Sequence, residues 1–264
     1  MASVRRDVLV ITIIVIIGLL LAMPLLTLTG NVRTVPFTLS IVASLAAIVF
    51  AWRVGRAYGS MVSMAMKYMR VGVIFLAAIQ AVMLIYLVGG VPATDQLRTW
   101  NNVMFLVAVI MFAAGMHHLT GAPAAEKRMS WKDRISIGAA VLLFLLLIVK
   151  RETCVVIASA VMTQLTQVYV FNAIGLIFAV YVAVRALQLH RHLGRTVTGS
   201  VGAFIASMLL LAGMQLWIIA ARLLDLTGDV RAIGAMVLLM LAMLALVEAF
   251  RRMTAAVAVD GRGS

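Results

Sequence analysis

Eight long apolar runs, separated by short basic gaps, constrain this chain more than any other feature of its sequence. The runs are Val8–Leu28, Pro36–Val54, Val71–Gly89, Asn102–Met116, Ile135–Val149, Val168–Leu189, Val201–Ala221 and Val230–Phe250. A helix needs about 20 apolar residues to cross a bilayer, and in lipid its backbone must satisfy its own hydrogen bonds. An apolar share of 64% supports this class, because soluble domains have roughly 45–50%. The sequence therefore predicts an all-α integral membrane protein with eight transmembrane helices, and the apolar stretch Thr153–Gln167 extends a neighbouring helix or lies at the membrane surface.

The lysine and arginine residues of the gaps follow an alternating pattern. Counted over alternate gaps, sixteen lie in one set and six in the other. The positive-inside rule assigns the richer set, which includes both ends of the chain, to the cytoplasm. We therefore expect cytoplasmic N- and C-termini and a multi-pass protein of the cytoplasmic (inner) membrane of a prokaryote. The net charge of +13 reflects this orientation signal and does not indicate nucleic acid as a partner.

The chain contains signs of an internal repeat. HHLTGAPAAEKR, residues 117–128, lies 134 positions before RRMTAAVAVDGR, residues 251–262, and the two share apolar, threonine, acidic and arginine positions. Asp95 and Asp229 have the same offset, and Gln80 and Gln215 have it with a slip of one residue. We interpret this as two tandem four-helix units, residues 1–128 and 129–264. Four spans in each unit give both units the same orientation, so the repeat is parallel.

Only one carboxylate, Glu248, lies within a run. It precedes Arg251 and Arg252 by three and four residues, a spacing that favours an ion pair near the cytoplasmic end of the last helix. The alternative is a buried proton or substrate site. A proton-driven or sodium-driven carrier is disfavoured, because such carriers usually need a carboxylate at mid-membrane.

Three uncharged amides inside the runs are the candidate ligand-binding residues, namely Gln80, Gln215 and Asn172. Amides in lipid commonly form hydrogen bonds between helices. If the repeat is real, Gln80 and Gln215 occupy related positions on the third and seventh spans. They then converge near the pseudo-axis, where they bind a polar headgroup or a quinone carbonyl.

Small residues spaced four apart predict close helix packing, within the chain or with a partner. They are Ala51, Gly55 and Gly59 at the end of the second run, and Gly202 and Ala206 in the seventh. The methionine-rich segment 61–69, around Lys67, fits an interfacial helix on the inner leaflet, with a soft copper site as the minority alternative.

Four histidines, in the cytoplasmic set of gaps, form a minority hypothesis of one shallow metal site. They are His117, His118, His190 and His192. A haem b held between helices is disfavoured, because adjacent residues on one helix diverge by about 100°. The repeat also pairs His117 and His118 with Arg251 and Arg252, which cannot ligate haem and which indicate a membrane-interface anchor.

The sequence contains no HExxH, phosphate-loop, GxSxG or aspartate-rich prenyl-diphosphate motif. The paired four-helix plan resembles the quinol-oxidising membrane anchors of dimethyl-sulfoxide-reductase-type enzymes and the haem A synthases, although the membrane histidines of the latter are missing here. WRVGRAYGS followed by RVGVIFLAAIQ is similar to the polytopic input domains of sensor kinases. We predict a non-catalytic membrane protein, sensor-like or a scaffold, that binds a lipophilic ligand or a partner subunit through its helix surfaces. The alternatives are a quinone-interacting anchor subunit of a respiratory complex, with quinone as cofactor, and a small-solute transporter. The expected partners are the lipid bilayer, other membrane subunits or a cytoplasmic protein on the basic face.

Overall fold

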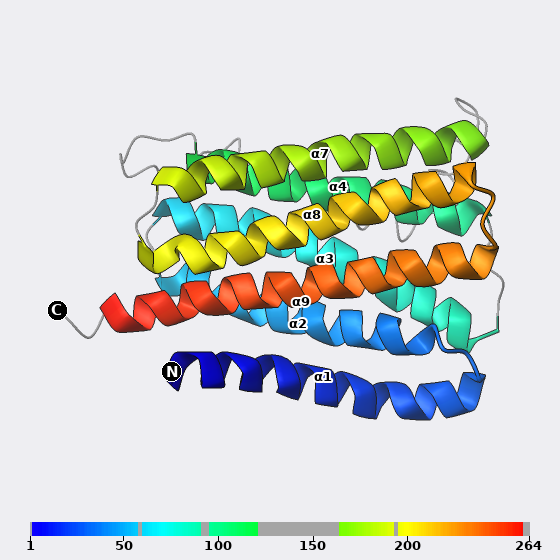
Figure 1. Ribbon diagram of the computed structural model, residues 1–264, viewed down its shortest axis with the longest axis horizontal. Coiled ribbons are helices and arrows are strands. Elements are labelled where there is room, and N and C mark those ends of the chain that lie inside the picture. Colours follow the sequence, from blue (N-terminus) through cyan, green and yellow to red (C-terminus); the bar gives the residue numbers. More distant parts are fainter. Residues whose placement is uncertain (1, 58–59, 91–94, 121–163, 193–194, 261–264) are drawn as a thin grey trace.

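The computed structural model describes residues 2–57, 60–90, 95–120, 164–192 and 195–260, and this part of the chain is helical throughout, without strands. Its helices are α1 (Ala2–Thr29), α2 (Thr34–Ala57), α3 (Ser60–Val88), α4 (Asp95–Thr120), α7 (Gln164–His192), α8 (Arg195–Leu223) and α9 (Gly228–Asp260). They lie side by side in one bundle, with their axes roughly aligned (Figure 1).

Each of these seven helices is long and apolar enough to cross a membrane. The mean hydropathy of the candidate spans ranges from 1.7 to 3.0. The described chain is therefore a multi-pass, all-helical membrane fold. Of the eight predicted runs, Ile135–Val149 lies outside the described residues. Within Thr153–Gln167, residues 164–167 open α7 and the rest lie outside the described residues.

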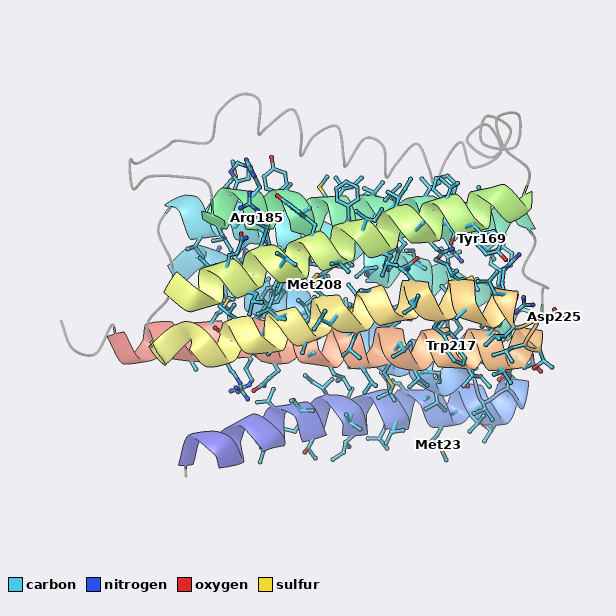
Figure 2. The ribbon with its side chains drawn as sticks, turned by 45° about the horizontal axis from the view of Figure 1, so that its top comes forward. Met23, Tyr169, Arg185, Met208, Trp217 and Asp225 are labelled. Atoms are coloured by element: carbon cyan, nitrogen blue, oxygen red, sulfur yellow. The ribbon has the colours of Figure 1, made fainter. Side chains whose placement is uncertain are left out.

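Six of the helices form a closed ring. Around it, each helix packs against the next in the order α2, α3, α4, α7, α8, α9, and α9 packs against α2. Helix α1 lies outside this ring and packs mainly against α2 (Figure 1). Many apolar side chains of α1 are exposed, including Leu20 at 67% and Met23 at 55%, and Met23 lies on the side of α1 turned away from the bundle (Figure 2). This arrangement gives α1 a lipid-facing surface.

The chain begins and ends at the same end of the bundle (Figure 1). Here α2, α4, α7 and α9 end, and α1, α3 and α8 begin. We call it the basic end, because the described side chains near it include Arg53, Arg56, Lys67, Arg70, Arg185, Arg251 and Arg252.

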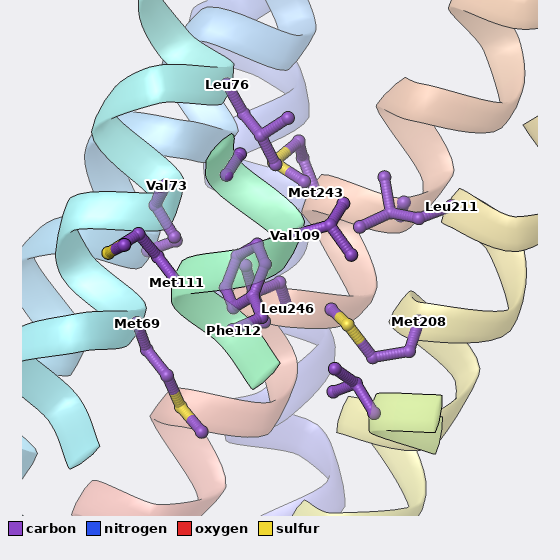
Figure 3. Close-up of a cluster of buried hydrophobic side chains, with 14 of the residues drawn as sticks. Met69, Val73, Leu76, Val109, Met111, Phe112, Met208, Leu211, Met243 and Leu246 are labelled. Carbon is purple, nitrogen blue, oxygen red and sulfur yellow. The ribbon is translucent and has the colours of Figure 1, made fainter. Parts of the chain in front are cut away.

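The interior of the ring is apolar. Side chains from α3, α4, α8 and α9 meet there, among them Leu76, Phe112, Met208 and Leu246 (Figure 3). The rings of Phe112 and Phe204 make an edge contact, with 6.4 Å between their centroids. This layer closes the middle of the ring with hydrocarbon.

The methionine-rich segment does not form a separate interfacial helix, and that expectation was wrong. Helix α3 begins at Ser60 and continues without a break to Val88. Met66 and Met69 are 0% and 1% exposed, respectively, and belong to the core. A basic residue such as Lys67 can lie at the start of a spanning helix, because its flexible stem carries the charge toward the headgroups.

Neighbouring helices approach most closely at small residues. A Cβ atom added to Gly72 of α3 would lie 2.9 Å from the carbonyl oxygen of Ala108 in α4. On the other side of the ring, the Ser207 hydroxyl of α8 donates a hydrogen bond of 2.8 Å to the carbonyl oxygen of Ala242 in α9. In both helix pairs a short residue allows one backbone to reach the other.

Candidate functional site

The most unusual side chain in the interior is that of Gln80. It lies one turn beyond Leu76 on α3 and is 0% exposed. Its Nε2 and Oε1 atoms are both buried and have no hydrogen-bond partner among the described residues. Nearly all buried polar side-chain atoms in proteins are bonded, and each one left unbonded costs about 1–3 kcal/mol. Within the described chain, the Gln80 amide therefore has unused capacity for hydrogen bonds.

Gln215 occupies the corresponding place on α8. It lies one turn beyond Leu211, as Gln80 lies one turn beyond Leu76, and it is 2% exposed. Helices α3 and α8 occupy opposite positions in the ring and run in the same direction (Figure 1). Gly175 of α7 faces this amide, since a Cβ atom at that position would lie 3.4 Å from the Gln215 Oε1 atom and 3.3 Å from the Phe105 ring. The missing side chain at residue 175 leaves room beside the amide.

A further amide, Asn101 of α4, was missed by the sequence reasoning. Its Nδ2 atom donates to the Met83 sulfur at 2.8 Å, whereas its Oδ1 atom is buried without a partner. The contacts of Gly72 with Ala108 and of Met83 with Asn101 fix the antiparallel register of α3 and α4. This register places Gln80 at the height of residues 100–104. Asn101 directly precedes the predicted run Asn102–Met116, and a polar residue next to a run boundary gave no signal of burial.

Asn172 of α7, the third predicted amide, is 1% exposed and interacts with other groups of the protein. It lies one turn before Gly175, which faces Gln215. The structure therefore places all three predicted amides, and Asn101, in the half of the bundle away from the basic end. All three predicted amides are buried.

At the basic end, Glu248 of α9 forms the ion pair that its spacing predicts. Arg251 donates two hydrogen bonds to it, of 2.8 and 2.9 Å, and the Nε atom of Arg252 donates to the same carboxylate. Arg252 also reaches the carbonyl oxygen of Gly199 in α8. The side chains of Glu248 and Arg251 are only 10% and 8% exposed, so this pair is more buried than an interfacial salt bridge. The Glu248 carboxylate therefore has a structural role as the acceptor of two arginine side chains.

The histidines are partly within the described side chains. His118 stacks on Tyr68 with 5.1 Å between ring centroids, and the rings of His117 and His118 are 6.4 Å apart. His190 and His192 lie in the last turn of α7, and their side chains are outside the described set. Among the described residues, no group of three or more histidine, cysteine, aspartate or glutamate side chains could hold a metal ion. The metal site remains a hypothesis that rests on sequence alone.

The predicted packing residues differ in their surroundings. Ala51 is fully buried, and a Cβ atom at Gly55 would lie 3.3 Å from Met66 of α3. Gly59 is outside the described residues. Gly202 and Ala206 lie on an exposed face of α8, and nothing in the described chain lies within 4 Å of a Cβ atom added to Gly202. No described helix packs against this face of α8 at Gly202.

Comparison with known proteins gives no family for this chain. No protein-family model, curated protein or solved structure matches it.

Proposed function

We propose that this protein is a non-catalytic membrane protein, sensor-like or a scaffold, that binds a lipophilic ligand between two tandem four-helix units. The observation that carries the proposal is the Gln80 side chain, which is fully buried with both amide atoms unbonded. Gln80 and Gln215 are the proposed binding residues, Asn101 adds a free acceptor atom, and Asn172 lines the same half of the bundle. The proposed setting is the cytoplasmic membrane of a prokaryote, with both termini in the cytoplasm.

The order of the ring supports the two-unit organisation, with residues 1–128 and 129–264 as the units. Exchanging α2, α3 and α4 for α7, α8 and α9 reproduces every neighbouring pair in the ring, including the closure of α4 on α7 and of α9 on α2. Paired helices also run in the same direction (Figure 1). These relations are what a parallel duplication would produce, and they place α1 outside the repeated ring.

Burial supports the same register. At an offset of 135 positions, buried residues of α3 match buried residues of α8, and at 134 those of α4 match those of α9. The pairs include Val73 with Met208, Leu76 with Leu211, Gln80 with Gln215, Val109 with Met243, and Phe112 with Leu246. A chance resemblance between apolar helices is not expected to keep their buried faces in step over two pairs of helices.

The chemistry of the ligand follows from the unbonded atoms. Gln80 offers a donor at Nε2 and an acceptor at Oε1, and the surrounding cluster is hydrocarbon. A charged group would be costly to bury here, because Glu248, the described intramembrane carboxylate, lies at the basic end with its own partners. We therefore propose an uncharged group that both donates and accepts, such as a hydroxyl or amide, on an apolar body.

A quinone-interacting anchor is the second candidate, because a quinone carbonyl accepts a hydrogen bond from Gln80 Nε2 and a quinol hydroxyl also donates to Oε1. Transport has less support. The apolar layer of Leu76, Phe112 and Met208 lies between the amides and the basic end (Figure 3). We also propose other membrane subunits, or a cytoplasmic protein that binds the basic face, as interaction partners.

Replacement of Gln80 by leucine tests the site. We expect a lipophilic compound to co-purify with the wild-type protein and to be absent from the variant, as measured by mass spectrometry of organic extracts. We also expect the ligand-free variant to be more stable than the ligand-free wild type by about 1–3 kcal/mol, because an unbonded buried amide is removed. Gln215→Leu should likewise weaken ligand binding.

Gln188→Leu is the matched control, because this glutamine is exposed on α7 and accepts a hydrogen bond from Arg185. Compared with Gln80→Leu, it should have little effect on the amount of bound compound or on the stability of the ligand-free protein. Retention of the compound by both Gln80→Leu and Gln215→Leu would contradict the proposed site. A clear loss of stability in ligand-free Gln80→Leu would indicate that an ordered water already satisfies the amide.

A further inference from the structure

We propose a second, separate binding site at the basic end of α2, where Trp52, Arg53 and Arg56 hold the phosphate of an anionic phospholipid. This site is independent of the interior amides and of the ligand proposed for them. It lies on the outer surface of the ring, near the last residue of α2, Ala57.

The position of the three residues matches the headgroup level of a membrane. Leu45, Val49 and Trp52 form an exposed stripe along α2, at 56%, 48% and 45% exposure, and Arg56 continues the stripe by one more turn. Side chains at this spacing lie on one face of a helix. The stripe passes from aliphatic to aromatic to cationic over about three turns, which is the order of hydrocarbon, interface and headgroup in a leaflet.

The stacking of Arg56 on Trp52 orients its guanidinium to bind a phosphate. Its guanidinium carbon lies 3.8 Å from the centroid of the Trp52 ring. Arginine stacked on an aromatic face keeps the N–H groups at its edge available, and these groups match the oxygen spacing of phosphate in a two-bond contact. Arg53, also exposed, lies one turn earlier and supplies a second positive charge near the same helix end.

The net positive charge of the described side chains at this end favours the binding of an anion. Among the side chains that the structure describes there, Glu248 is the carboxylate, and it pairs with Arg251 and Arg252. None of the ion pairs in the described chain involves Arg53 or Arg56. Juxtamembrane arginines are attracted to the anionic lipids of a leaflet. A lipid fits better than a soluble acidic protein, because the exposed Trp52 face would be buried in the bilayer interface.

Helix α7 offers a matched control. Arg185 lies in the last two turns of α7, at the same end of the bundle (Figure 2). Its guanidinium donates hydrogen bonds to the Tyr181 hydroxyl and to Gln188 Oε1, both at 3.2 Å. Neighbours on its own helix therefore satisfy part of this arginine, and we do not expect it to retain a phosphate.

The test is native mass spectrometry of the full-length protein from bilayer nanodiscs containing phosphatidylcholine and phosphatidylglycerol in equal parts. We expect wild type to retain phosphatidylglycerol preferentially, and Arg53→Gln/Arg56→Gln to reduce this retention about tenfold. Trp52→Leu and Arg56→Lys should give intermediate losses, since the former removes the stacking surface and the latter the two-bond contact. Arg185→Gln should behave as wild type.

Equal retention of phosphatidylglycerol by wild type and the double variant would overturn the proposal. An equal loss in Arg185→Gln would also overturn it, because net charge and not a built site would then account for the lipid. Competition by inorganic phosphate as effective as that by phosphatidylglycerol would show an anion site without lipid specificity and would contradict the proposed partner. The four changed side chains lie at the surface of the bundle, and an unchanged thermal transition will show that each variant is folded.

Discussion

Glu248→Gln is expected to lower the free energy of unfolding by about 3–5 kcal/mol, because it removes the negative charge from a buried ion pair. Arg251 donates two hydrogen bonds to this carboxylate, and its side chain is 8% exposed. Glutamine has nearly the same shape, so little packing is lost and the change isolates the charge. Unfolding in mixed micelles, followed by circular dichroism over a denaturing-detergent series, measures the effect.

Arg252→Gln is the matched control for this prediction. The Arg252 side chain is 45% exposed, and its removal leaves Glu248 paired with Arg251. We expect a loss of about 1 kcal/mol or less, as for other solvent-exposed ion pairs. Comparable losses in Glu248→Gln and Arg252→Gln would contradict a structural role for the buried pair. A double variant Glu248→Gln/Arg251→Met should recover part of the stability, because the buried positive charge is removed together with the negative one.

The Glu248 pair could be predicted from the sequence because it depends on local geometry. Residues three and four apart share one face of any helix, so a carboxylate followed by two arginines at these positions forms a pair wherever the helix lies. The spanning helices could be predicted for a similar reason, since apolar length alone identifies them. Both inferences need only the neighbours of each residue along the chain.

The order of the helices in the ring, in contrast, depends on which helices pack against each other. A local sequence pattern does not predict this. The offset between Gln80 and Gln215 indicated related positions, but only the packing order places α3 and α8 opposite each other. Likewise, the methionines at the start of α3 were assigned to the membrane surface because a lysine lies among them. The adjoining helices cover Met66 and Met69, a fact of tertiary packing.

Two of the close approaches between helices, at Gly72 and Gly115, were also missed. Spacing of small residues drew attention to Gly202 and Ala206, which are exposed on α8. Gly72 and Gly115, which have no small residue four positions away in the predicted pattern, face backbone oxygens of the adjoining helix instead. A small residue marks a contact only when another helix is present opposite it, and composition cannot supply that condition.

Gly72→Leu is therefore expected to be strongly destabilising, by about 3 kcal/mol, the upper end for an overpacked interior. A Cβ atom at residue 72 would meet the Ala108 carbonyl oxygen at 2.9 Å and the Phe112 ring at 3.3 Å. The carbonyl belongs to the backbone of α4, so relief requires the two helices to separate. That separation would also pull apart the apolar layer in which Phe112 lies beside Leu246 (Figure 3). The same detergent unfolding series measures the loss.

Gly202→Leu provides the comparison, because it introduces the same side chain and removes glycine from a spanning helix in the same way. Nothing in the described chain lies within 4 Å of a Cβ atom at residue 202. We expect a change within about 0.5 kcal/mol, or a small gain from replacing a helical glycine. If both leucine variants lose the same free energy of unfolding, the loss comes from placing leucine in these helices and not from a clash with α4. That outcome would contradict the claim that the close approach of α3 and α4 requires a glycine at residue 72.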